Sequence, residues 1–180
     1  MAQITPHSRP VELAYRSGFT LQALGLLALV ISPDASRLDS AWSVIGYVLI
    51  SAGVLISGWL LQVYMPEVRL IVLAGAVIGC LLQAAGAMGA GGYLIPLGLG
   101  FVFVGSCGLV GKEAYCFRFR EGWYLMPVLA LLTVALLVQN TLDHPMPVTS
   151  VLLILATALL FSFTIRKYKM PFYGKCGGND

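Results

Sequence analysis

The chain has 180 residues, of which 58% are apolar and only 11% are charged, and its mean hydropathy is +0.86. Soluble domains carry roughly 25% charged residues, so this chain lacks the charge that would cover a water-exposed surface. The composition therefore predicts a membrane protein. It excludes a disordered chain, which needs low hydrophobicity, and a collagen-like chain, because the glycines have no three-residue period.

Six apolar segments are each long enough to cross a hydrocarbon core about 30 Å thick, which takes roughly 20 helical residues. We expect an all-α, polytopic helical membrane protein whose single domain covers residues 1–180, with helices at residues 13–31, 41–64, 68–88, 93–111, 123–139 and 147–165. A β-barrel would need strands of about ten residues that alternate apolar and polar side chains, and the sequence does not alternate in this way.

The first segment is harder to assign than the others, because its uncharged apolar stretch covers only residues 19–31. That length also suits the core of a signal peptide or an interfacial helix. Extending the helix back to Leu13 makes it long enough to span, and it places Arg16 in the first turns, from where its long side chain would reach the headgroups. Residues 32–35 contain no small-x-small cleavage pattern, so we expect an uncleaved first helix.

Charge asymmetry predicts the orientation of these helices. With six crossings, one face receives ten of the 11 cations: Arg9, Arg16, Arg69, Lys112, Arg118, Arg120, Arg166, Lys167, Lys169 and Lys175. The other face receives only Arg37. By the positive-inside rule, both termini are cytoplasmic in a cell inner membrane, or stromal in a thylakoid membrane.

The apolar segments contain few groups that could do chemistry. All eight acidic residues are expected in loops or at segment ends, which disfavours a proton-coupled carrier or pump built on a buried carboxylate. We interpret the most polar residues of the segments as contacts between helices, with a solute pathway as the alternative: Gln22, Gln62, Gln83 and Gln139.

Glycines are concentrated between Gly75 and Gly111. Close packing of the third and fourth helices is the expected reason. Gly75-x-x-x-Gly79 is a small-x-x-x-small pair, and the fourth helix has one smooth face on which a neighbour's backbone could rest, formed by Gly100, Val104, Gly105, Gly108 and Gly111. The alternative is that these notches admit a pigment, a quinone or a lipid tail, or that they form a hinge.

Catalytic and metal-binding motifs are missing from the sequence, so we expect no catalytic residues, no metal and no cofactor, with a bound pigment or quinone as an open alternative. His7 and His144 lie in a tail and a loop rather than in facing helices. The four cysteines form no CxxC motif. Cys116 lies among cations, which lower the pKa of a thiol, so it is the candidate for a reactive thiolate.

One segment, residues 112–123, combines charges with aromatic rings and is expected as an inner loop between the fourth and fifth helices. As an extended strand or as an interfacial helix, it would place rings towards the membrane and guanidinium groups towards phosphate. We expect contacts to an anionic lipid, a partner protein or an anionic small molecule through Lys112, Glu113, Tyr115, Cys116, Arg118, Arg120 and Glu121. The alternative is a loop that only fixes topology. Nucleic acid is not expected as a partner, because the basic residues are few and are opposed by acids.

A family resemblance appears at the start of this segment. The string Gly-Lys-Glu-Ala-Tyr-Cys-Phe at residues 111–117 follows a glycine-rich helix in a small polytopic chain. In these residues, in size and in helix pattern, the chain resembles an uncharacterised family of integral membrane proteins, a domain of unknown function, found chiefly in cyanobacteria. The resemblance implies a membrane of a photosynthetic cell and carries no activity or catalytic residues.

The sequence thus favours a non-catalytic integral membrane protein, an accessory or assembly factor that binds a membrane-complex partner or lipid through residues 112–123. The first alternative is a small transporter or channel for a neutral or weakly polar solute. The second is a membrane thiol redox protein that uses Cys107 and Cys116.

Overall fold

The structure is a computed structural model that describes residues 9–61 and 66–170. The described residues form six α-helices, each long and apolar enough to cross a membrane. In chain order they are α1 (Arg9–Ile31), α2 (Ala41–Trp59), α3 (Pro66–Ala85), α4 (Leu94–Phe117), α5 (Arg120–Leu142) and α6 (Pro147–Lys169), with a π-helical turn, η1 (Gly86–Ala90), continuing α3. The all-α, six-helix prediction is confirmed.

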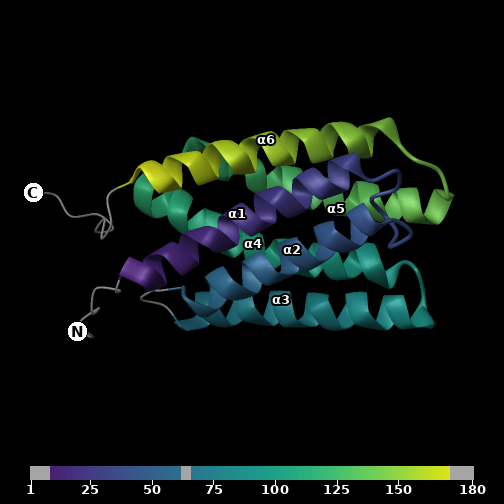
Figure 1. The fold of residues 1–180 in the computed structure, drawn as a ribbon, viewed down its shortest axis with the longest axis horizontal. Coiled ribbons are helices and arrows are strands. Elements are labelled where there is room, and N and C mark those ends of the chain that lie inside the picture. Colours follow the sequence, from purple (N-terminus) through teal and green to yellow (C-terminus); the bar gives the residue numbers. More distant parts are fainter. Residues whose placement is uncertain (1–8, 62–65, 171–180) are drawn as a thin grey trace, which may run out of the picture.

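The helices form an elongated antiparallel bundle in which each helix packs against the next one along the chain (Figure 1). α1 also packs against α6, so the first and last helices close the bundle, and α2 packs against α4. α3 is the least buried of the six helices. The core therefore lies among the other five helices, and α3 lies at the edge.

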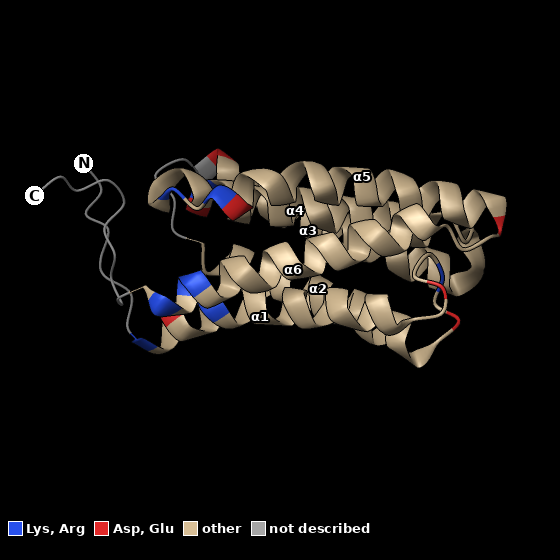
Figure 2. Ribbon diagram, turned by 90° about the horizontal axis from the view of Figure 1, so that it is seen from above, with Lys and Arg blue, Asp and Glu red and all other residues tan. Residues whose placement is uncertain are grey.

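Charged residues gather at the two ends of the bundle (Figure 2). The end where α1 begins and α6 ends, called here the basic end, carries Arg9, Arg16, Arg69, Lys112, Arg118, Arg120, Arg166, Lys167 and Lys169. The opposite end carries Arg37. Lys175 lies outside the described residues. The distribution of the described cations between the two ends matches the division expected from the sequence.

The prediction of a loop at residues 112–123 is wrong. α4 continues to Phe117 and α5 begins at Arg120, so only Arg118 and Phe119 connect the two helices. A helix satisfies its own backbone hydrogen bonds, and the charged residues of its last turns can face partner groups inside the bundle or headgroups outside it. Charge alone therefore does not end a helix at the membrane surface.

The bounds of the other helices differ less from those expected from the sequence. α1 begins at Arg9 rather than at Leu13, and α6 continues to Lys169, because charged end residues are tolerated at headgroup level. α2 ends at Trp59, and residues 62–64 of the expected second helix lie outside the described part. At the start of α2, Ser40 and Ser43 form a reciprocal capping box, in which each side chain accepts from the backbone N–H of the other.

The expected close packing of α3 and α4 is confirmed at its glycines. A Cβ atom placed on Gly79 would lie 2.5 Å from the carbonyl oxygen of Gly98, and one placed on Gly75 would lie 2.9 Å from that of Phe101. The glycines of α4 do not share one face, however, since a Cβ on Gly100 would meet Thr133 of α5. Small residues thus let α4 approach two neighbours at once.

Candidate functional site

Glu113 is the centre of a buried group of ionic side chains at the basic end. Its side chain is 0% exposed. One carboxylate oxygen accepts hydrogen bonds from the Tyr15 hydroxyl at 2.7 Å and the Lys112 ammonium at 2.9 Å, and the other accepts from Lys167. A buried carboxylate is costly unless it is paired and hydrogen-bonded, and these three donors supply that compensation.

The donors to Glu113 come from three helices. Tyr15 lies on α1, Lys112 is the neighbour of Glu113 on α4, and Lys167 lies near the end of α6. The Lys167 ammonium also lies over two aromatic rings, 4.7 Å from the centroid of Phe117 and 5.5 Å from that of Tyr15. Cation–π contacts of this kind hold an ammonium in a site that is largely closed to water.

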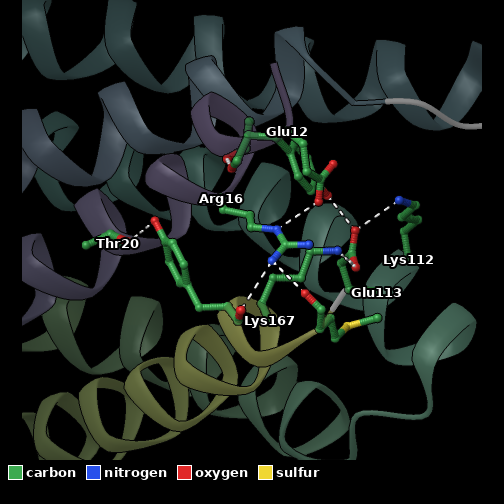
Figure 3. Close-up of polar contacts among 10 residues, drawn as sticks. Glu12, Arg16, Thr20, Lys112, Glu113 and Lys167 are labelled. Atoms are coloured by element: carbon green, nitrogen blue, oxygen red, sulfur yellow. Dashed lines mark hydrogen bonds and ion pairs between the residues drawn. The ribbon is translucent and has the colours of Figure 1, made fainter. Parts of the chain in front are cut away.

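Arg16 extends the same group towards the end of α6 (Figure 3). Its Nε donates to Glu12 at 2.8 Å, and its Nη1 donates to the carbonyl oxygens of Met170 at 3.1 Å and Tyr168 at 3.4 Å. The last carbonyls of a helix have no intrahelical partner and carry partial negative charge, so a guanidinium satisfies them. Arg16 therefore joins the first helix to the last.

This position of Arg16 corrects the sequence-based expectation. The sequence predicts that Arg16 reaches the headgroups, whereas its side chain is only 2% exposed and is turned into the bundle. The reason is that α6 ends beside α1 and offers its terminal carbonyls and the nearby Glu12 as partners. We call the six residues of this group the buried ionic cluster: Glu12, Tyr15, Arg16, Lys112, Glu113 and Lys167.

The cluster is closed on its inner side by aromatic rings. Phe19 stacks edge-on against Tyr15 with ring centroids 5.4 Å apart, and it lies 5.3 Å from Phe163. Phe163 in turn meets Phe119 in a T-shaped contact at 5.4 Å. Packing of this kind removes water and strengthens the electrostatic contacts of the cluster.

Three cations and two carboxylates make up the charges of the cluster, so its formal balance is one positive charge. The cluster lies near the C-terminal ends of α4 and α6, where helix dipoles favour positive charge. No group of three or more His, Cys, Asp or Glu residues that could hold a metal occurs among residues 9–61 and 66–170. The arrangement is suited to joining α1, α4 and α6.

The seven residues expected as one contact site do not lie together. Lys112 and Glu113 belong to the buried ionic cluster, and Glu121 forms an ion pair with Arg166, whose Nη1 donates to both carboxylate oxygens. Three others face outwards at the basic end: Tyr115, which is 79% exposed, Arg118 and Arg120. With the exposed rings of Trp123 and Tyr124, these three form a surface that we call the basic turn.

Cys116, the seventh expected contact, is disulfide-bonded in the structure, whereas Cys80 and Cys107 are free thiols. The free, cation-activated thiolate expected at Cys116 therefore does not occur in this state. A disulfide sulfur has no thiolate to act as a nucleophile.

Sequence reasoning missed four members of the cluster: Glu12, Tyr15, Arg16 and Lys167. One signal was available, since Glu12 and Arg16 have the i, i+4 spacing of an ion pair on one helix face. Tyr15 and Lys167 left no such signal. Each of them meets Glu113 only through the tertiary fold.

Six apolar helices, a basic end and buried charges that satisfy one another define a multi-pass, α-helical integral membrane protein. Residues 56–179 match the model of a family described as "Uncharacterized integral membrane protein (DUF2301)", and the chain belongs to this family. The assignment agrees with the resemblance drawn from residues 111–117, while occurrence in cyanobacteria stays a prediction. No curated protein and no solved structure matches the chain.

Proposed function

We propose that this chain is a non-catalytic accessory protein of the membrane that binds anionic lipid through the basic turn. The partner chemistry is a phosphate-bearing headgroup at the membrane surface. Arg118 and Arg120 supply the cations, and Tyr115, Trp123 and Tyr124 lie between headgroups and acyl chains, where amphipathic rings are favoured.

The conformation of Arg118 carries the proposal. Arg118 ends α4 with φ of 54° and ψ of 40°, in the left-handed region that glycine or asparagine usually occupies at this position. An arginine there costs about 1 kcal/mol relative to a relaxed backbone. Strain of this kind at an exposed position supports a need for the guanidinium group itself, because glycine would end the helix at lower cost.

The proposal includes the orientation of the helix bundle in the membrane. The basic end would face the cytoplasm, where the inner leaflet carries anionic lipid and attracts basic segments. The membrane would be the cell inner membrane or, in a photosynthetic cell, the thylakoid membrane.

Native mass spectrometry of the purified protein, mixed with equal amounts of phosphatidylglycerol and phosphatidylcholine, tests the proposal. We expect the wild type to retain phosphatidylglycerol preferentially. Arg118→Ala/Arg120→Ala should weaken this binding roughly 30-fold, because each cation near the surface contributes about 1 kcal/mol. Arg37→Ala, which removes a cation from the opposite end, is the matched control and should retain the wild-type preference.

A second variant separates lipid binding from stability. Arg118→Gly removes the cation and the backbone strain together, so the unfolding free energy should rise by up to about 1 kcal/mol while phosphatidylglycerol binding weakens. Wild-type lipid binding by the double alanine variant would overturn the lipid proposal. If that variant instead loses a co-purifying membrane protein, the basic turn is a protein contact.

The two alternatives drawn from the sequence have less support. A solute pathway would use Gln62, which lies outside the described residues, and Gln83, whose side-chain oxygen accepts a hydrogen bond from Ser51 on α2. That contact supports interhelical joining more directly than transport. A thiol redox function that pairs Cys107 with Cys116 has less support, because Cys116 is disulfide-bonded while Cys107 is a free thiol, so these two cysteines are not bonded to each other.

A further inference from the structure

A segment of α1 and a segment that covers the end of α3 and the start of η1 share a sequence pattern. Residues 18–25 of α1 and residues 79–86 of α3 and η1 both read G-x-x-L-Q-A-x-G. A second pattern, G-x-x-L-I-x-x-G, occurs at residues 46–53 within α2 and at residues 91–98, where Gly91 precedes α4 and residues 94–98 form its start. Each pattern places a glycine, then a larger residue four positions later, then a glycine three positions after that, which is one face of a helix.

The two pairs of segments also pack in the same way. A Cβ on Gly53 would lie 2.4 Å from the carbonyl oxygen of Gly18 and 2.8 Å from Cγ of Gln22. At the corresponding place, a Cβ on Gly98 would lie 2.6 Å from the carbonyl oxygen of Gly79 and 2.8 Å from Cγ of Gln83. The same atoms thus meet at nearly the same distances in both helix pairs.

The second contact of each pair agrees as well. A Cβ on Gly25 would lie 2.6 Å from Cγ1 of Ile50 and 2.8 Å from the carbonyl oxygen of Gly46. A Cβ on Gly86 would meet Cγ1 of Ile95 at 2.7 Å and the carbonyl oxygen of Gly91 at 3.3 Å. Three of the four glycine contacts therefore repeat between α1–α2 and α3–α4. The fourth does not, because a Cβ on Gly46 would meet the carbonyl oxygen of Gly25, whereas one on Gly91 would meet the ring of Tyr93.

We propose that α1–α2 and α3–α4 are two copies of one glycine-packed hairpin, and that the glutamine of each copy is its docking residue for the other copy. The Gln22 oxygen on α1 accepts a hydrogen bond from Ser106 on α4 at 2.7 Å. The Gln83 oxygen on α3 accepts one from Ser51 on α2 at 3.2 Å. Each glutamine thus reaches the second helix of the other copy, so the surface that each hairpin recognises is a second hairpin of the same kind.

A diverged third copy fits the remaining helices. On α6, Thr149, Leu153 and Ala156 follow the same spacing and are buried. On α5, Ala135 and Gln139 occupy the first two positions and are buried, while the third position is the exposed Leu142. Gln139 also reaches another copy, because its amide donates to Asp34 in the loop between α1 and α2 at 2.8 Å. The whole bundle then consists of three hairpins that point the same way.

The two full copies differ at the glutamine amide. In the first copy, the Gln22 amide donates to the carbonyl oxygen of Gly18 at 3.3 Å. In the second copy, the buried Gln83 amide nitrogen has no hydrogen-bond partner among the described residues. An unpaired donor in an apolar environment is unfavourable, so Gln22 is the stronger docking residue of the two.

Cross-linking in the full chain tests the docking pairs. In a variant whose four native cysteines are replaced by serine, Gln22→Cys/Ser106→Cys and Gln83→Cys/Ser51→Cys are treated with a short bifunctional thiol reagent. Intact mass should show one reagent bridging both thiols in each pair. Gln83→Cys/Ser106→Cys is the control: Gln83 packs on Gly98, and Ser106 lies about 12 Å further along α4. Its thiols should each take a separate reagent molecule.

Matched glycine variants test the equivalence of the copies. Gly53→Leu and Gly98→Leu should lower the apparent melting temperature by similar amounts, roughly 3 to 10 °C, because both overfill the same contact. Gly92→Ala, where the nearest atom would be 3.7 Å away, should leave the melting temperature unchanged. If the leucine variants do not accumulate, Gly53→Ala and Gly98→Ala make the same comparison.

The outcomes decide the proposal in either direction. The proposal is supported if both docking pairs are bridged and the control pair is not. It also requires that the variants at Gly53 and Gly98 lower the melting temperature by similar amounts. Absence of a bridge in either docking pair overturns the docking role of the glutamines. Tolerance of a larger residue at one of the two glycines and not at the other overturns the equivalence of the copies.

Discussion

Glu113 is held by donors from three helices, and this arrangement explains how a carboxylate is kept within an apolar bundle. The three donors together provide two positive charges and a hydroxyl group within hydrogen-bond distance. Lys112 retains 22% exposure, so it links the buried carboxylate to the membrane surface. Lys167 has no such access, because its side chain is only 5% exposed.

The dependence of Lys167 on Glu113 leads to a stability prediction. Glu113→Leu removes the counter-charge of a buried ammonium, so it should lower the free energy of unfolding by about 3–5 kcal/mol. Glu113→Leu/Lys167→Met replaces the buried pair with apolar groups of similar volume, so it should recover most of that loss. Unfolding titrations in mixed micelles measure both variants.

The ion pair of Glu121 and Arg166 serves as the control for this prediction. Arg166 is 46% exposed, and exposed pairs contribute about 0.2–1 kcal/mol, so Glu121→Gln should cost no more than that. A loss at Glu113→Leu as small as the loss at Glu121→Gln would contradict the structural role of the cluster.

The burial of Glu113 could not be read from the sequence. Tyr15 and Lys167 lie 98 and 54 residues from Glu113, and the two lysines look like any basic residues at a helix end. Whether such a residue faces headgroups or the bundle depends on which helix stands beside it. Sequence patterns report helix faces, and they do not report neighbours that are distant in the chain.

At the scale of elements, the loop between α1 and α2 is built around Asp34 at the opposite end. The Asp34 carboxylate accepts hydrogen bonds from the backbone N–H and the hydroxyl of Ser36 and from the Gln139 amide. Partial burial raises the pKa of Asp34, but these hydrogen bonds and the charge of Arg37 outweigh burial and hold its pKa below the ordinary value. The loop is thereby fastened to α5.

This lowered pKa predicts how stability depends on pH. A carboxyl whose pKa is lower in the folded state stabilises the fold above its unfolded pKa of about 3.9, and this contribution is lost as the pH falls through the folded pKa. Asp34→Asn should therefore be less stable than the wild type at pH 6, with a difference that shrinks below about pH 4. Thermal unfolding measured between pH 6 and pH 3 checks this.

Asp39 provides the matched control, because it is an exposed acid in the same loop. Asp39→Asn should be about as stable as the wild type at pH 6, because its side chain is exposed. A constant difference between the wild type and Asp34→Asn at every pH would mean that the carboxylate charge of Asp34 does not stabilise the loop.

Helix number and approximate position were predictable because each span needs about 20 apolar residues, whatever its neighbours are. The residue at which α4 ends was not predictable, because the charged residues that follow Gly111 in the sequence indicate the start of a loop. Gly75 and Gly79 pointed to close packing of α3 and α4, since a small-x-x-x-small pair exposes backbone on one helix face. The matching contact of Gly18 with Gly53 becomes visible only when both helices of the hairpin are compared.

At the scale of the whole molecule, two cations among the described residues are buried, so the charge asymmetry has to be assessed from the exposed charges alone. Arg16 forms an ion pair with Glu12, and Lys167 forms one with Glu113, so both cations add little to the charge at the membrane surface. The basic end still presents exposed cations from four helices or their connections: Arg9, Arg69, Arg118, Arg120 and Lys169. The opposite end presents Arg37, which is paired with Asp143. The asymmetry therefore survives when only exposed charges are considered.

This asymmetry predicts that the basic end is cytoplasmic, and single cysteines can check it in a variant without the native cysteines. Asp39→Cys reports the opposite end and Lys169→Cys the basic end, and both positions are exposed. In spheroplasts, or in sealed vesicles of known sidedness, a membrane-impermeant maleimide should label Asp39→Cys from the non-cytoplasmic side. Lys169→Cys should react only after the membrane is opened, because moving exposed cations across the bilayer is disfavoured during insertion. Labelling of Lys169→Cys in sealed spheroplasts would indicate the opposite orientation. The basic turn would then lie away from the leaflet whose anionic lipid it is proposed to bind.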